Sequence, residues 1–124
     1  MTIHEDVMAA LGMGAEVEIR GVKYTAHPMT CAEHLEYIRM CSDAPFEPLP
    51  DGTVIRRYKD RADEANDTRA MMYVLWTALR KQERGVLPPF IEWVDVTPAS
   101  AMVVFSDLIG AVLKATVEPY QKKN

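Results

Sequence analysis

The residues best suited to metal chemistry are His27, Cys31 and His34, with Cys41 further along the chain. Imidazole nitrogen and thiolate sulfur are zinc ligands, but a structural zinc site needs four donors that converge on one point. On a helix that turns by about 100° per residue, Cys41 lies about 280° around the axis from Cys31. The pattern therefore favours a surface histidine pair and two helix-packed thiols, and we expect no metal or other cofactor.

Acid–base chemistry has one candidate, the carboxylates Asp60, Asp63, Glu64 and Asp67 in a single predicted helix. Arginines and a lysine interleave with them, which is typical of a solvated helix face. The histidines have no evident carboxylate partner that would make them a base for a nucleophile, and the sequence contains no glycine-rich phosphate loop. We therefore expect a protein that is not an enzyme.

Composition and charge exclude several classes of function. A chain of 124 residues with 48% hydrophobic content fits a single domain over residues 1–124. Its net charge of −4 argues against a general nucleic-acid binder, which needs a concentrated basic surface. The start of the chain does not resemble a signal peptide, and no apolar run reaches the roughly 18 residues that indicate a membrane span. These features predict a cytoplasmic protein that binds neither nucleic acid nor membrane.

The cysteines are expected to stay reduced. Cys31 and Cys41 fall in one predicted helix, where ten residues at about 1.5 Å per residue separate them by roughly 15 Å. A disulfide requires Cα atoms within about 7 Å of each other, so the two thiols cannot bridge.

Alternating residues predict a two-stranded β-hairpin over residues 16–26, with a tight turn at Arg20-Gly21. A short helix over 4–11 is predicted before it. An isolated hairpin is marginal in water, so this one must lie on helices or pair with another chain. Its apolar residues are therefore candidates for self-association: Val17, Ile19, Val22 and Tyr24.

A capping box, Thr30 to Glu33, predicts the start of the next helix, to which Leu35 and Ile38 give an apolar face. Three prolines then predict a mobile loop over residues 43–53.

The second half of the chain predicts further helices. Residues 54–84 contain neither glycine nor proline and predict one long helix or two abutting ones, with charged pairs such as Arg56 and Asp60 in its polar first half. Residues 71–79 are apolar and belong in the core.

The last two helices have proline-marked starts. Pro88-Pro89 opens a short helix, and Thr97-Pro98 starts a final helix that ends at Pro119, leaving a flexible tail over 120–124. The predicted fold is mainly α (α+β), a helical domain of four to five helices with a small N-terminal antiparallel hairpin.

Two surfaces are candidates for binding a partner. Eight methionines are many for this length, and a flexible thioether repacks against different partners. The mobile loop and the polar helical stretch beside it form the second surface. The candidate partner-binding residues are Met29, Met40, Phe46, Leu49, Arg57 and Arg61.

The order of elements resembles the tail assembly chaperones of long-tailed (siphovirus) bacteriophages. The resemblance covers most of the chain beyond residue 14 and is one of layout. The segments that carry it are the hairpin over 17–25 followed by Pro28-Met29-Thr30 into a helix, the apolar helix over 73–80, and the segment 90–95 with Thr97-Pro98 before a terminal helix.

The resemblance implies a helical protein of the host cytoplasm that oligomerises and coats the tape measure protein. Such a chaperone keeps its client soluble, recruits tail tube protein and is absent from the mature virion. The family often makes a longer product by translational frameshifting, and Lys122-Lys123-Asn124 is compatible with a slippery run of adenines. The alternatives are a structural head–tail connector or minor tail protein retained in the virion, and a small regulator that binds one bacterial protein.

Overall fold

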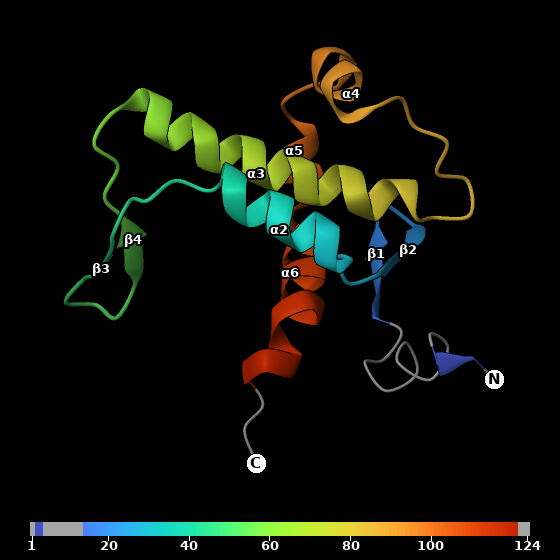
Figure 1. Cartoon of the computed structure of the whole chain (residues 1–124), viewed down its shortest axis with the longest axis horizontal. Helices are drawn as coiled ribbons and strands as arrows, with labels where there is room; N and C mark the ends of the chain where they lie inside the picture. Colours follow the sequence, from blue (N-terminus) through green and yellow to red (C-terminus); the bar gives the residue numbers. More distant parts are fainter. Residues whose placement is uncertain (1, 4–13, 122–124) are drawn as a thin grey trace.

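The computed structural model describes residues 2–3 and 14–121, and for 118–121 it describes the backbone alone. The helix predicted over 4–11 and the last three residues of the predicted tail lie outside this range. The described chain forms an α+β fold with five helices, α2 to α6, and two small antiparallel strand pairs (Figure 1). The predicted fold class is therefore confirmed. None of the helices formed by the described residues combines the length and apolar composition that a membrane span requires.

The first hairpin forms as the sequence predicts. Strand β1 (Ala15–Ile19) pairs with β2 (Val22–Ala26), and Val17 faces Tyr24 across the pair. Arg20 and Gly21 form the turn with φ of 50° and 80°, and positive φ at both central residues is the type I′ geometry that suits a two-residue hairpin.

The hairpin packs on the core. Ile19 and Ala26 are buried, and the Tyr24 ring meets Phe105 edge-on at 5.4 Å. Both strands lie against α6 (Ser106–Gln121). Burial against a helix thus provides the support that an isolated hairpin lacks.

Helix α2 (Cys31–Met40) starts at the predicted capping box: the Glu33 amide donates to the Thr30 hydroxyl and the Thr30 amide donates to the Glu33 carboxylate. The predicted apolar face is wrong. Leu35 and Ile38 are 68% and 53% exposed, whereas Glu33 is buried. The inward face instead carries Glu33, which pairs with Lys81, and Tyr37, which packs against the hydrophobic core.

A second hairpin replaces part of the predicted loop and part of the predicted long helix. Strands β3 (Phe46–Pro48) and β4 (Val54–Arg56) pair with Phe46 opposite Arg56. Arg56 forms an ion pair with Asp67 at 3.0 Å instead of the predicted pair with Asp60. This long-range pair favours an extended Arg56 over a helical one.

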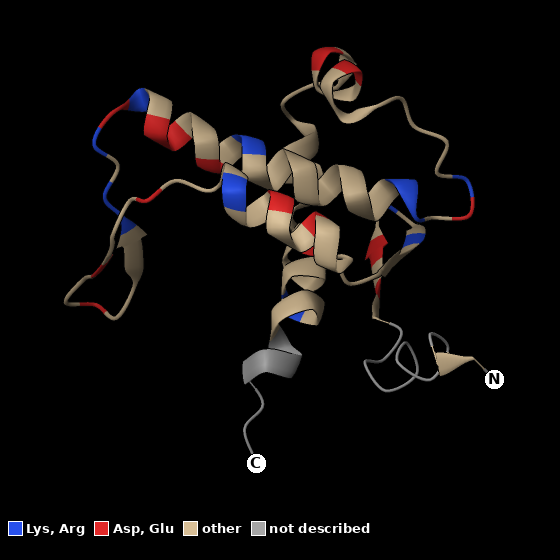
Figure 2. Cartoon of the chain, viewed as in Figure 1, with Lys and Arg blue, Asp and Glu red and all other residues tan. Residues whose placement is uncertain are grey.

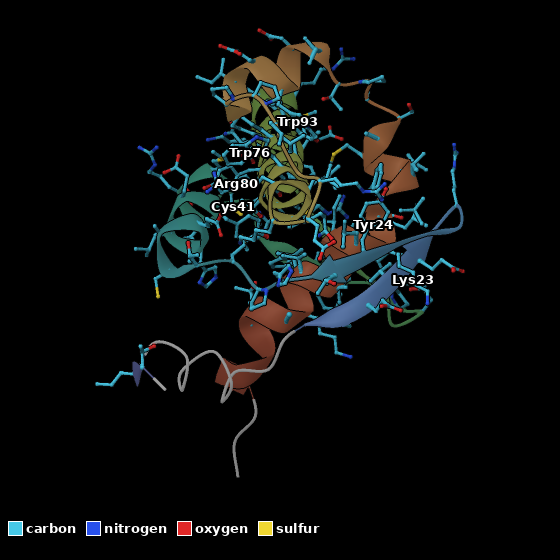
Figure 3. The ribbon with its side chains drawn as sticks, turned by 90° about the vertical axis from the view of Figure 1, so that its right-hand side faces the viewer. Lys23, Tyr24, Cys41, Trp76, Arg80 and Trp93 are labelled. Atoms are coloured by element: carbon cyan, nitrogen blue, oxygen red, sulfur yellow. The ribbon has the colours of Figure 1, made fainter. Side chains whose placement is uncertain are left out.

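Helix α3 (Arg61–Arg80) begins seven residues later than predicted, because Asp60 caps it by accepting the Asp63 amide at 2.8 Å. Its C-terminal half supplies the core, as predicted. Seen along α3 in Figure 3, the other helices surround it. The buried core residues that α3 contributes are Ala70, Tyr73, Val74, Leu75 and Ala78.

Two short helices, α4 (Phe90–Val96) and α5 (Ala101–Val104), and the longer α6 complete the described chain. Helix α4 forms where Pro88-Pro89 predicts it. Thr97, predicted to start the last helix, instead ends α4 by donating its amide to the Trp93 carbonyl. Helix α6 runs past Pro119 to Gln121, because a proline near a helix end removes only one backbone hydrogen bond.

Candidate functional site

A groove on the surface lies between α2 and the start of α4, with α3 as its floor. It has a volume of about 1030 Å³. We call it the α2–α4 groove. In Figure 3 the labelled Trp76 and Arg80 lie on the side of α3 that faces the angle between α2 and α4. The residues that define it here are Glu33, Arg69, Tyr73, Trp76, Arg80 and Phe90.

The floor of the α2–α4 groove is aromatic. The Tyr73 and Phe90 rings meet at a right angle with centroids 5.2 Å apart, and Trp76 lies 5.7 Å from each of them. Edge-to-face pairs of this kind hold rings in fixed relative positions. Trp76 is fixed further because its indole N–H donates to the Pro88 carbonyl at 3.0 Å. The floor is therefore built in advance of any ligand.

Two arginines border this aromatic floor. The Arg69 guanidinium carbon lies 5.5 Å from the Phe90 ring centroid, and that of Arg80 lies 4.6 Å from the Trp76 centroid. Both distances are within cation–π range. Each arginine therefore lies along a ring, with its charge held at the rim of the groove.

Glu33 is the buried carboxylate of the groove. Lys81 pairs with its Oε1, while Arg80 Nε lies 3.9 Å from its Oε2, too far for a hydrogen bond. Oε2 is buried and has no hydrogen-bond partner among the described residues. A buried acceptor without a donor is unfavourable, so the pair with Lys81 is the contact that stabilises this carboxylate in its buried position.

Tyr73 is buried beside these carboxylates. Burial, together with the negative charges of Glu33 and Glu36, raises the pKa of its hydroxyl above the ordinary value of 10.0. The phenol is therefore neutral at physiological pH. It contributes an apolar ring and a hydroxyl donor to the groove rather than a charge or a general base.

A second hollow of about 400 Å³ lies where the β3–β4 hairpin meets α2 and α3. Asp67 is its centre: it accepts from the Ser42 amide at 2.8 Å and from the Tyr58 hydroxyl at 2.8 Å, and it pairs with Arg56. Burial alone raises the pKa of Asp67, but these donors and the Arg56 charge outweigh it, so the pKa lies below its ordinary value. This network attaches the hairpin, and all its members are already partnered.

A third hollow of about 860 Å³ lies between β2 and the chain that follows α3. There the Gln82 side chain amide pairs with the backbone of Thr25, accepting its N–H at 3.0 Å and donating to its carbonyl at 2.8 Å. At Thr25 this outer edge of β2 is therefore already occupied by a side chain of the same molecule.

The four predicted self-association residues differ in how far the structure buries them. Ile19 is buried, and Val17 and Tyr24 pack against the core. Val22 alone of the four is exposed, at 38%. The prediction that their apolar faces are available is thus wrong for Ile19, because α6 covers this side of the hairpin.

The six predicted partner-binding residues are also dispersed. Met29 is buried, so its predicted exposure is wrong; its amide donates to the Thr116 hydroxyl at 3.0 Å. Met40 lines the α2–α4 groove. Phe46 is 67% exposed on β3, under the Arg56 guanidinium. The other three also lie away from the α2–α4 groove: Leu49 is half-buried beyond β3, Arg57 is exposed and pairs with Glu47, and Arg61 is exposed at the start of α3.

Sequence reasoning missed the residues that define the groove. Arg69, Tyr73, Trp76 and Arg80 recur at four-, three- and four-residue intervals, which places them on one face of a helix. That spacing is a usable signal, although the apolar composition of residues 71–79 equally predicts a buried core helix. Within the described part of the chain, no three His, Cys, Asp or Glu side chains lie close enough together to hold a metal ion.

Comparison with known proteins returned no match: no family model, no curated protein and no solved structure matches this chain.

Proposed function

We propose that this protein is a tail assembly chaperone of a long-tailed bacteriophage, a non-enzymatic protein that binds the tape measure protein, keeps it soluble and recruits tail tube protein. The proposal starts from the resemblance in the order of elements between this sequence and that family. It places the protein in the host cytoplasm during assembly and outside the mature virion.

The observation that carries the proposal is the α2–α4 groove with its preformed aromatic floor. A tape measure protein is a long helical client whose apolar faces are uncovered before the tail tube encloses it. A shallow groove of about 1030 Å³ with an aromatic floor and a charged rim offers reversible cover to one short stretch of such a helix. Many copies that each bind weakly along a rod coat it through avidity, without any single tight site.

Exposed apolar side chains outside the groove are consistent with an assembly of copies. Leu35, Val96 and Val103 are each more than two-thirds exposed, on three different helices. Single exposed apolar residues are ordinary on a monomer, so these positions suit weak contacts rather than a permanent interface. We therefore propose self-association on the client, and not a stable oligomer of the free protein.

The test is to follow the protein through phage assembly. Cells that produce the phage are lysed, the protein is captured with an antibody, and its partners and the purified virions are analysed by mass spectrometry. The proposal expects a large helical protein in the captured material and no copy of this chain in mature particles. Retention in the virion would instead identify a structural head–tail connector or minor tail protein.

A further inference from the structure

We propose that the α2–α4 groove binds an amphipathic helix that has an acidic side chain at each end of an apolar stripe about three turns long. This inference rests on the proposed function for the identity of the client, but the chemistry of the site follows from the groove itself.

The spacing of two arginines on α3 sets the expected length of the partner's apolar stripe. Arg69 and Arg80 are eleven residues apart, so at about 1.5 Å per residue they lie roughly 16 Å apart along the same face. The ten residues between them carry no charge, and in Figure 2 this part of α3 is tan with blue at both ends. A partner helix that runs along α3 places two charged residues about three turns apart against these arginines.

The apolar character of the stripe comes from the aromatic floor. Tyr73, Trp76 and Phe90 form one cluster, and Ile91 stands 69% exposed at its border. Leucine, isoleucine or methionine side chains at intervals of three and four residues on a partner helix match a floor of this length. Aromatic clusters that are partly covered are typical anchor points for such contacts.

The basic groups of the groove that have no close acidic partner determine the sign of the charge expected on the partner helix. Lys81 is paired with Glu33, and Arg39 is paired with Glu36 at 2.6 Å. Arg69 has no ion-pair partner among the described residues, and Arg80 has only the long 3.9 Å contact to a carboxylate that Lys81 already serves. The chain as a whole carries a net charge of −4, so this groove is a local positive site on an acidic protein. Carboxylates are its complement.

The Glu33 carboxylate lies near Arg80 and affects which groups of the partner helix can bind at that end of the stripe. When a partner carboxylate engages Arg80, Glu33 keeps its pair with Lys81 and is not left as an unpaired buried charge. Its Oε2 is buried and has no hydrogen-bond donor among the described residues, so a partner helix in the groove does not reach this oxygen. A second acidic group on the partner helix close to Glu33 would still be repelled by its charge.

The experiment uses the full chain and two synthetic helices of about 16 residues. Both peptides carry the same apolar stripe; one has glutamate at its two ends and the other has lysine. Affinities are measured by isothermal titration calorimetry. The inference expects the glutamate peptide to bind about tenfold or more tightly than the lysine peptide, with a difference that shrinks as salt is added.

Variants separate this site from a general charge effect. Arg69→Glu reverses one end of the stripe and is expected to weaken the glutamate peptide about tenfold while strengthening the lysine peptide. Lys114→Glu is the matched control, because it reverses one charge as Arg69→Glu does and Lys114 is exposed on α6 outside the groove. Its affinities are expected to remain within about twofold of those of the unaltered chain. Arg80→Gln, checked for folding by circular dichroism, tests the other end without placing a new carboxylate beside Glu33.

Three results would overturn the inference: equal affinity for the two peptides, an Arg69→Glu variant that keeps the original preference, or a concentration-dependent dimer that Arg69→Glu abolishes, which would make a second copy the occupant. The titration contains no phage protein. Its outcome is therefore separate from the virion and capture experiments, and the groove inference and the proposed function can fail independently.

Discussion

The two β-hairpins of this protein are held to its helices by different forces. The β1–β2 hairpin buries Ile19 and Ala26 against the core and sets the Tyr24 ring against Phe105. The β3–β4 hairpin instead leaves Phe46 and Val54 67% and 59% exposed. Polar bonds to Asp67 attach it. The first hairpin is therefore part of the cooperative fold, whereas the second is a surface element that can open separately.

The largest expected effect lies in the first hairpin. Ile19→Ala removes a buried side chain and leaves a cavity, and we expect it to lower the free energy of unfolding by about 2–4 kcal/mol. Urea unfolding followed by circular dichroism measures this change. Val54→Ala in the second hairpin is the matched control, with an expected change within about 0.5 kcal/mol. An equal loss of unfolding free energy in the two variants would contradict the proposed difference between the hairpins.

An intermediate effect is expected from Asp67→Asn. The variant keeps the size of the side chain but removes the charge that Arg56 faces at 3.0 Å. We expect the β3–β4 hairpin to open more easily by about 1–3 kcal/mol, since hydrogen bonds to a charged group contribute that much, while global unfolding changes less. Amide hydrogen exchange at residues 46–48 and 54–56 measures local opening. Unchanged exchange there would show that Asp67 does not hold the hairpin.

Lowering the pH should weaken the attachment of the β3–β4 hairpin through Asp67. Because the pKa of Asp67 in the folded chain lies below its ordinary value of 3.8, its ionised form stabilises the fold fully above that value. This stabilisation is lost as the pH falls through the lower, folded-state pKa. We expect the β3–β4 amides to lose protection against hydrogen exchange before the β1–β2 amides as the pH is lowered from about 5 to about 2. Simultaneous loss of protection in both hairpins, or an unchanged pH dependence in Asp67→Asn, would contradict this account.

The smallest effect concerns the two thiols. Cys31 is exposed, whereas Cys41 lines the hollow under the β3–β4 hairpin. Burial raises the pKa of the Cys41 thiol, so less thiolate is present at neutral pH. We expect Cys31 to react with iodoacetamide severalfold faster. In Asp67→Asn the rate at Cys41 should rise while Cys31 serves as the internal reference, and mass spectrometry of timed samples measures both. A Cys41 rate that does not change in Asp67→Asn would show that the hairpin does not shield it.

Local patterns in the sequence predicted the elements that are held by local interactions. The β1–β2 turn, the capping box at Thr30 and the α4 start after Pro89 all depend on neighbouring residues and formed as predicted. The strands β3 and β4 have three residues each, too few for an alternating pattern to show. Their position depends on Arg56 meeting Asp67, a contact between residues that the sequence alone gave no reason to pair.

The candidate site was harder to predict for the same reason. Glu33, Trp76 and Phe90 come from three different helices, and only the packing of α2 and α4 on α3 brings them to one groove. The periodicity of helix α2 led to a wrong prediction of its buried face. Leu35 and Ile38 face solvent, while Glu33 pairs with Lys81 and Tyr37 packs against the core. The buried face of this helix therefore depends on contacts with residues far away in the sequence.

The most direct test of the central claim, that this is a binding protein whose client occupies the α2–α4 groove, is capture of the tape measure protein from co-expressing cells. The unaltered chain and Lys114→Glu should retain it, and Arg69→Glu should lose most of it. Equal capture by all three would show that the client binds elsewhere, and no capture by the unaltered chain would contradict the proposed function.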